Sequence, residues 1–126
     1  MASPNLLSKH LQIAAGLTAT TTYYASLGGA GGEWQLDSAE LMPDASFAAD
    51  ATNYFVITIQ QGSSVIGTIT LASQTLAAGT SVAFALTKDV DAEFAGDDPI
   101  TVLVTEAGSA TSVACRVEMV FRKVRS

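Results

Sequence analysis

The segment Val113–Phe121 places the strongest constraint on how this chain can fold. Its odd positions are all apolar, whereas its even positions include Arg116 and Glu118. An alternation of apolar and charged residues with a period of two is typical of a β-strand that is buried on one face only. Because a half-buried strand needs a second layer to cover its apolar side, the segment predicts a two-layered β-structure.

The chain contains further segments of the same kind. Alternating residues bounded by Gly, Pro, Asp or Ser predict strands at residues 36–42, 52–61, 65–71, 82–87 and 100–105. Their spacing predicts an all-β fold, an antiparallel β-sandwich with Greek-key connections. The sequence leaves open whether the topology is that of a jelly roll or of an immunoglobulin-like sandwich. The Cys-Trp-Cys pattern of true immunoglobulin domains is missing, because the chain has a single cysteine.

A glycine-rich run divides the predicted strands from the start of the chain. Residues 28–32 contain four glycines in five positions, which is typical of a flexible joint. We therefore expect residues 1–32 to form an extended N-terminal arm with a Gly-rich hinge, and residues 33–126 to form the β-sandwich domain. Within the arm, residues 1–10 are expected to be a poorly ordered lead-in. Residues 11–17 alternate as in a strand, although a helix is a competing interpretation there.

The chain carries little charge for its length. Charged residues make up 14% of the sequence, compared with about 25% in an average soluble domain. A surface of this kind favours partial coverage by partner subunits, with a neutral soluble monomer as the alternative. The formal net charge of −6 argues against nucleic acid as the main partner. No apolar run approaches the roughly 20 residues that a membrane-spanning helix requires, so no membrane partner is expected.

Two regions are expected to contact other subunits. Paired tyrosines on an arm offer a large contact area at a low cost in side-chain entropy. A basic C-terminal segment is suited to dock onto an acidic surface, although a solvated terminus is an equal alternative. The predicted partner-contact residues are Leu11, Ile13, Leu17, Tyr23, Tyr24, Arg122, Lys123 and Arg125.

The sequence offers no constellation of residues for catalysis. A nucleophile needs a base beside it, and the only histidine, His10, lies in the expected lead-in. Cys115 is on the apolar side of its predicted strand, where it is expected to be a small buried hydrophobe. One histidine and one cysteine do not supply the three or four ligands of a zinc site. We therefore expect no enzymatic activity, no cofactor and no metal centre.

An acidic segment at residues 89–98 is the one candidate for a cation site. It places five carboxylates within ten residues, and calcium prefers clustered oxygen ligands. The spacing of its first three acids is that of the start of an EF-hand loop. However, Phe94 occupies the position of the turn glycine and Ile100 that of the bidentate glutamate. A solvated acidic loop is the favoured interpretation, and a cation site is the alternative.

Three stretches of the predicted body resemble small β-sandwich virion proteins of tailed bacteriophages, a group that includes head decoration, or cement, proteins. They are residues 36–41 (LDSAEL), 51–57 (ATNYFVI) and 95–102 (AGDDPITV). The resemblance covers roughly residues 36–121 and carries no catalytic residues. It implies a structural virion protein on the capsid surface that binds the outside of an assembled phage head and stabilises it.

The resemblance also implies the partners. They are the major capsid protein and sister subunits, in a homo-oligomer for which a trimer is favoured. A tail- or fibre-associated virion module is one alternative function. A secreted β-sandwich that binds glycan or calcium is another, since Trp34, Tyr54 and other aromatic residues offer a carbohydrate platform if they are not part of the core.

Overall fold

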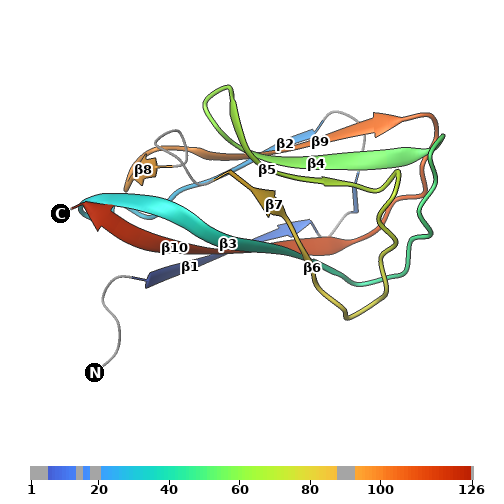
Figure 1. The fold of residues 1–126 in the computed structure, drawn as a ribbon, viewed down its shortest axis with the longest axis horizontal. Coiled ribbons are helices and arrows are strands. Elements are labelled where there is room, and N and C mark those ends of the chain that lie inside the picture. The colour runs from blue at the N-terminus through green and yellow to red at the C-terminus, as the bar shows by residue number, and fades with distance from the viewer. Residues whose placement is uncertain (1–5, 14–15, 18–20, 88–92, 126) are drawn as a thin grey trace.

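The computed structural model describes residues 6–13, 16–17, 21–87 and 93–125 of the chain (Figure 1). In this part of the chain no helix is present, and ten strands form two antiparallel sheets. The strands are β1 (Leu6–Ile13), β2 (Thr21–Ala25), β3 (Glu33–Pro43), β4 (Tyr54–Gln61), β5 (Ser64–Thr70), β6 (Val82–Ala83), β7 (Ala85–Leu86), β8 (Glu93–Ala95), β9 (Ile100–Ala107) and β10 (Cys115–Arg125).

The two sheets are the two layers of a sandwich. Sheet A has the strand order β1-β10-β3-β6, and β8 also pairs with β3. Sheet B has the order β2-β9-β4-β5-β7. Figure 1 shows sheet A as the lower layer and sheet B as the upper layer. The predicted all-β antiparallel β-sandwich is therefore confirmed.

Four strand pairs are nested one inside the other along the chain. They are β4 with β5, β3 with β8, β2 with β9, and β1 with β10. The innermost pair is joined by the turn at Gly62 and Ser63, and each further pair joins residues that lie farther from this turn on both sides. One long hairpin wrapped into two sheets in this way is the arrangement of a jelly roll. Of the two topologies that the sequence left open, the strand pairing is that of the jelly roll.

The apolar sides of both sheets meet in one core. Every second residue from Val113 to Phe121 is buried, as the alternation predicted. In β4 the same holds for Phe55, Ile57 and Ile59. No polar or charged side chain is buried among the described residues. Burial of a large apolar side chain contributes about 1.5–3 kcal/mol, so this core is the main source of the stability of the sandwich.

A β-bulge in β3 lets this strand fill the core in spite of an irregular sequence pattern. Val120 pairs with Ser38, whereas the next residue of β10, Phe121, pairs with Leu36. Asp37 is therefore the extra residue of the bulge. Because the bulge shifts the alternation by one position, Leu36 and Ala39 both point into the core.

The predicted strand at residues 82–87 is divided between the two sheets. Val82 and Ala83 pair with β3 of sheet A, whereas Ala85 and Leu86 pair with β5 of sheet B. Phe84 lies buried at the crossing, and its N–H donates to the carbonyl of Ala39 at 2.9 Å. The alternation in this segment therefore reflects a chain that passes from one layer to the other.

The prediction of an extended N-terminal arm is wrong for the described residues. β1 pairs with β10 along its whole length, and β2 pairs with β9, so each sheet receives one strand from this part of the chain. Ile13, Leu17 and Leu27 belong to the core. The predicted boundary at residue 32 therefore separates no arm from the sandwich. The physical reason is that β1 and β2 pair with the backbone groups along one side of β10 and β9, and that this part of the chain adds apolar side chains to the core.

The glycine run is a tight crossing between the sheets. Gly28, Gly29 and Gly32 have φ values of 69°, 77° and 89°, in the left-handed region that other residues seldom adopt. The N–H of Gly29 donates to the carbonyl of Gly96 at 3.0 Å. A Cβ atom at Gly96 would collide with the backbone of Ala30, so the chain passes very close at this point. The glycines allow the backbone to adopt positive φ values and to pass close to a neighbouring segment. The expected flexible hinge is therefore a tight crossing within the fold.

Candidate interaction surface

The outer face of sheet B is distinguished by the absence of charge. In β2, β9, β4 and β5 the inward residues are buried or pack on the core, and the alternate residues point outward. The outward residues are Thr22 and Tyr24 of β2, Thr101, Leu103 and Thr105 of β9, Val56, Thr58 and Gln60 of β4, and Val65, Thr68 and Thr70 of β5. None of these described residues is charged, and we call this surface the uncharged face.

The strand register brings the most exposed apolar side chains of this face into one row. Tyr24 is 69% exposed and Val65 is 50% exposed, and they are two of the three exposed large hydrophobic residues among those described. Thr101 pairs with both Tyr24 and Gln60, and Gln60 pairs with Val65, so one row crosses all four strands. Apolar groups at both ends of an uncharged row are features of a protein-binding surface.

The predicted contact residues of the N-terminal region have different environments. Tyr24 lies on the uncharged face, whereas Tyr23 is half-buried and packs against the core. Leu11 is also half-buried against the core. Ile13 and Leu17 are only 1% exposed, so the prediction that they contact a partner is wrong. Their apolar character is explained by packing between the sheets.

The basic C-terminal residues belong to the end of β10. The Nε atom of Arg122 lies 3.6 Å from Oδ1 of Asp37 at the bulge. The Nζ atom of Lys123 lies 5.7 Å from the centroid of the Trp34 ring, within the range of a cation–π contact. Arg125 pairs with Glu33 in the strand register, and its side chain lies outside the described residues. The contacts of Arg122 and Lys123 fix them to sheet A.

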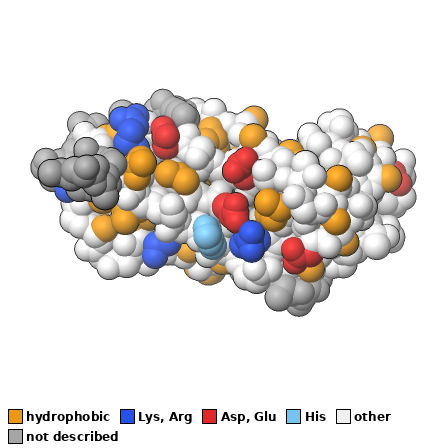
Figure 2. Space-filling view, turned by 90° about the horizontal axis from the view of Figure 1, so that it is seen from below, with side chains coloured by type: hydrophobic (Ala, Val, Ile, Leu, Met, Phe, Trp, Pro, Cys, Tyr) orange, Lys and Arg blue, Asp and Glu red, His pale blue; other side chains and the backbone are white. Residues whose placement is uncertain are grey.

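The outer face of sheet A differs from the uncharged face in composition. Its outward residues are Leu6, Ser8, His10 and Gln12 of β1, Arg116, Glu118, Val120 and Arg122 of β10, and Gln35, Ser38, Glu40 and Met42 of β3. We call this surface the charged face. Figure 2 shows it from below, with acidic and basic side chains gathered over its middle.

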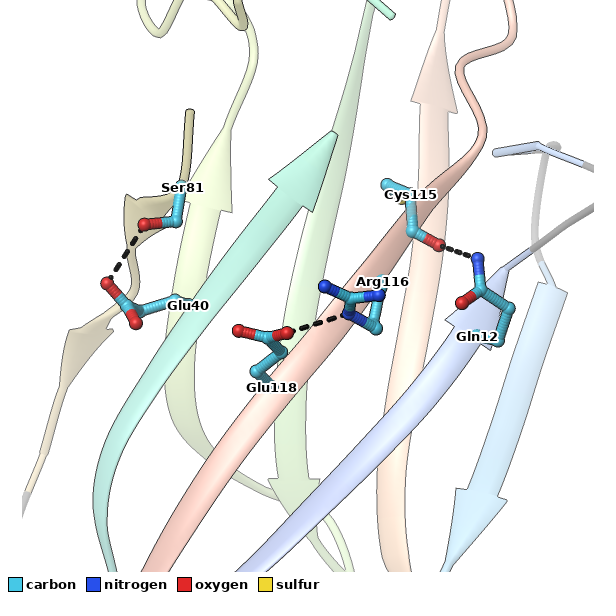
Figure 3. Close-up of polar contacts among 6 residues, drawn as sticks. All are labelled: Gln12, Glu40, Ser81, Cys115, Arg116 and Glu118. Atoms are coloured by element: carbon cyan, nitrogen blue, oxygen red, sulfur yellow. Dashed lines mark hydrogen bonds and ion pairs between the residues drawn. The ribbon is translucent and has the colours of Figure 1, made fainter. Parts of the chain in front are cut away.

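Several polar groups of the charged face have partners on the same face (Figure 3). The Nε atom of Arg116 lies 2.7 Å from Oε2 of Glu118 in an ion pair. The hydroxyl of Ser81 donates to Oε2 of Glu40 at 3.1 Å. Glu40 and Glu118 lie directly opposite each other in the register, and His10 lies opposite Glu118 on the other side. These charges therefore interact with one another within the sheet.

The two residues considered for nucleophilic chemistry lie on opposite sides of sheet A. His10 is exposed on β1, which corrects its expected place in a poorly ordered lead-in. Cys115 is fully buried between the sheets, as predicted. Burial, with a smaller contribution from the negative charge of Asp44, raises the pKa of the Cys115 thiol to about 12. A thiol in this state is unreactive, because the thiolate is the nucleophilic form.

Part of the predicted acidic loop is ordered structure. Residues 88–92 lie outside the described part of the chain. Glu93–Ala95 form β8, and the N–H of Ala95 donates to the carboxylate of Asp98 at 2.9 Å. The prediction of a solvated loop is therefore wrong for Glu93–Ala95, whereas residues 96–98 form a turn in which Asp97 is exposed. Among the described residues, no group of three or more His, Cys, Asp or Glu side chains is placed to hold a metal ion.

A shallow depression of about 300 Å³ lies at one end of the sandwich, beside Phe47 and Thr111. Its acidic residue is Asp50, whose carboxylate accepts hydrogen bonds from the N–H groups of Asn53 and Thr52. These bonds lower the pKa of Asp50. The side chain of Asn53 in turn accepts a bond from the N–H of Ser109 at 2.9 Å. The polar groups of the depression hold turns together.

Comparison with known proteins gives no relative for this chain: no family model, no curated protein and no solved structure matches it. In the described residues, no helix is long and apolar enough to cross a membrane. The surface that we single out therefore rests on the geometry of the sandwich.

The sequence predicts Tyr24 as a contact residue, but it does not predict the uncharged face around this residue. A signal was present, because the polar alternate positions of residues 54–60 and 100–105 are all uncharged. Which of these positions share a surface depends on the pairing of β4 with β9, which the sequence alone does not give.

Proposed function

We propose that this chain is a structural virion protein that binds the outside of an assembled phage head and stabilises it. In this proposal the uncharged face is the surface that contacts the major capsid protein, and the chain acts by binding, without catalysis. The resemblance of residues 36–41, 51–57 and 95–102 to virion β-sandwich proteins supports the virion role. The resemblance also favours a homo-oligomer on the capsid surface.

The observation that carries the proposal is the uncharged face itself. A sheet face that meets only water has no need to exclude charge, and the opposite sheet of this molecule carries several charged residues outward. Charged residues are depleted in the central parts of protein interfaces, where aromatic residues are enriched. Tyr24 at the end of the uncharged row of Thr101, Gln60 and Val65 fits such a surface, because the ring offers a large contact area with few rotatable bonds.

The test compares empty heads with and without the protein. Shells assembled from the major capsid protein of the same phage are mixed with the purified chain, sedimented, and then heated. We expect the chain to co-sediment and the decorated shells to resist heat better than the bare shells. Absence of co-sedimentation together with equal heat resistance would refute the proposal.

A pair of matched variants assigns the binding to one face. Thr101→Lys introduces a charge between Tyr24 and Gln60 on the uncharged face, and Ser38→Lys introduces the same charge on the charged face. We expect Thr101→Lys to abolish co-sedimentation and Ser38→Lys to leave it intact, since a desolvated unpaired charge is costly at an interface. Equal binding by both variants would exclude the uncharged face as the contact surface.

The two alternative functions are distinguished by other measurements. Immunolabelling of complete particles would place a tail- or fibre-associated module away from the head. Binding to a glycan array, or a change in stability on titration with calcium, would support a secreted binding module instead.

A further inference from the structure

Sheet A changes its pairing partner along one side of β3. On this side β8 pairs with Glu33–Gln35, and β6 pairs with Glu40 and Leu41. The chain leaves sheet A after Ala83, because the next residues cross to sheet B. A groove of about 520 Å³ lies between β3 and this crossing segment. We call it the β3 notch, and it is lined by residues 37–40, Ala83, Phe84 and Leu86.

The inner wall of the β3 notch is apolar and fixed in place. Phe84 and Ala39 are 5% and 3% exposed, and the N–H of Phe84 donates to the carbonyl of Ala39 at 2.9 Å. Leu86 lines the same groove and packs against the core. The notch therefore offers a preformed surface on which an aliphatic chain can pack.

Both charged residues that line the β3 notch are acidic. Oε2 of Glu40 accepts a hydrogen bond from the hydroxyl of Ser81 at 3.1 Å, which orients this carboxylate (Figure 3). Asp37 is the bulge residue of β3, and its Oδ1 lies 3.6 Å from Nε of Arg122. An ionised carboxylate has about four acceptor positions, so each of the two can bind a further donor while these contacts remain.

We propose that the β3 notch binds a lysine or arginine side chain on an extended segment of a partner protein. The aliphatic part of this side chain packs on Phe84 and Leu86, and its cationic end lies between Asp37 and Glu40. Long cationic side chains combine an apolar stem with a charged end, which matches the apolar wall and the two carboxylates. The formal net charge of −6 attracts a basic partner at longer range as well.

The composition of the notch selects this occupant over others. A metal ion such as calcium takes about six to eight oxygen ligands and gains nothing from an apolar wall. Among the described residues, no group of three or more His, Cys, Asp or Glu side chains is placed to hold one. A second copy of this acidic chain is disfavoured by charge. The notch follows β3 between its pairing with β8 and its pairing with β6, so an extended segment fits along it.

This inference goes beyond the proposed function and does not depend on it. The β3 notch lies beside β3 of sheet A, whereas the surface proposed to contact the capsid lies on the outer face of sheet B. A molecule bound to a phage head through sheet B can therefore hold a basic segment in the notch at the same time.

The test titrates the full, isotope-labelled chain with short peptides and follows its amide signals by NMR. The probes are acetylated and amidated peptides of the form Thr-Val-Xaa-Val-Thr, with lysine or arginine at the centre. Two control peptides carry norleucine, which lacks the charge, or diaminopropionic acid, which lacks the long stem. We expect the lysine and arginine peptides to shift the amide signals of residues 37–40 and 83–86 until these saturate. Each control peptide should bind at least about fivefold more weakly, because it loses either the charge-assisted hydrogen bonds or the apolar contact.

A pair of variants with equal net charge locates the site. Glu40→Gln removes a carboxylate of the notch, whereas Glu118→Gln removes one from the same face of sheet A outside the notch. We expect Glu40→Gln to weaken binding of the lysine peptide at least about fivefold and Glu118→Gln by no more than about twofold. The reason is that attraction between charges falls with distance and is screened by solvent.

A second pair of variants separates this inference from the proposed function. Ser38→Lys places a cation in the β3 notch, and Thr101→Lys places the same charge on the uncharged face. We expect Ser38→Lys to lose binding of the lysine peptide but to co-sediment with shells, and Thr101→Lys to show the reverse. The amide spectrum of each variant also reports whether its sandwich is folded.

Four results would each overturn the proposed site. They are the absence of saturable shifts with the lysine and arginine peptides, saturable shifts located away from the notch, binding of the norleucine peptide as tight as that of the lysine peptide, and equal weakening by Glu40→Gln and Glu118→Gln. None of these results bears on the proposed function, which is tested by binding to shells.

Discussion

The two sheets of this sandwich share one core but present opposite kinds of surface to the outside. On sheet A, Arg116, Glu118 and Glu40 lie side by side and interact with one another or with neighbouring side chains. On sheet B, the corresponding outward positions are occupied by threonine, glutamine, valine, leucine and tyrosine. Both sheets meet the same demand on their inner sides, where the residues are apolar and buried.

This difference shows that the fold determines the type of residue at inward positions. The type of residue at outward positions depends on whether water or another protein covers each face. A jelly roll needs apolar residues at alternate positions, and it places no such demand on the positions between them. Charges that pair within a sheet are compatible with water as the only neighbour. An uncharged face is compatible with coverage by protein, which is why the proposed contact with the capsid lies on sheet B.

The largest expected effect comes from removing the strands that complete both sheets. Deletion of residues 1–32 takes away β1, β2 and three core residues, Ile13, Leu17 and Leu27. Their burial contributes about 5–9 kcal/mol, which is comparable to the whole stability of a typical domain. We expect the truncated chain to be unfolded, as measured by circular dichroism and by the absence of a cooperative thermal transition. A folded truncated chain would restore the separate arm that the glycine run predicted.

The next effect separates the inner and outer sides of a single strand. Val117→Asp places an unpaired charge in the core and should cost several kcal/mol. Val120→Asp makes the same change on the charged face of β10, where the residue is half-buried and water can reach the carboxylate. We expect urea denaturation to show a much smaller loss for Val120→Asp. Similar losses for the two variants would mean that the charged face is less open to water than its composition indicates.

The strands were predictable from the sequence wherever alternation was regular. Val113 to Phe121 and residues 54–60 have the predicted inward and outward sides, because a period of two leaves a single assignment. β3 was harder, because the bulge at Asp37 shifts its alternation by one position. β8 was missed, because three residues next to acidic positions carry too little pattern to identify a strand.

The arrangement of the strands depended on contacts that local patterns do not carry. The pairing of Leu6 with Arg122 joins residues at opposite ends of the chain. This pairing distinguishes the jelly roll from the alternative topology, and it makes the N-terminal segment a strand of sheet A. The glycine run had two physical explanations, flexibility and a tight crossing with positive φ. Only the approach of Gly96 to Ala30 distinguishes them. The uncharged face also depends on contacts between distant segments, since it is formed by the alignment of four separate strands.

Alkaline pH should weaken the core beneath the charged face through Cys115. The folded chain holds the thiol proton up to a pKa of about 12, whereas the unfolded chain releases it near 9.0. In this window the unfolded state binds fewer protons, so stability falls as pH rises, by about 1.4 kcal/mol per pH unit from this group. The stability contribution is fully present below pH 9.0.

The variant Cys115→Ala isolates this contribution. It loses packing to the same extent at every pH, but it lacks the ionisable group. We therefore expect the difference in urea stability between the natural chain and Cys115→Ala to shrink as pH rises above 9.0. A difference that stays constant would show that the thiol ionises in the folded chain as easily as in the unfolded one.

The smallest effect tests whether the charges of sheet A are balanced among themselves. Arg116 is paired with Glu118, and Glu118 also lies opposite Glu40. Arg116→Gln removes the ion pair and leaves two carboxylates opposed, which should cost up to about 1 kcal/mol. Glu118→Gln removes the same ion pair but also the repulsion between the carboxylates, so its net effect should be close to zero.

Salt should reduce the difference between the two urea midpoints, because these side chains are partly exposed. A larger loss for Glu118→Gln than for Arg116→Gln would mean that Glu118 makes a further favourable interaction, such as one with His10 opposite it, and that the charged face is not balanced in this way.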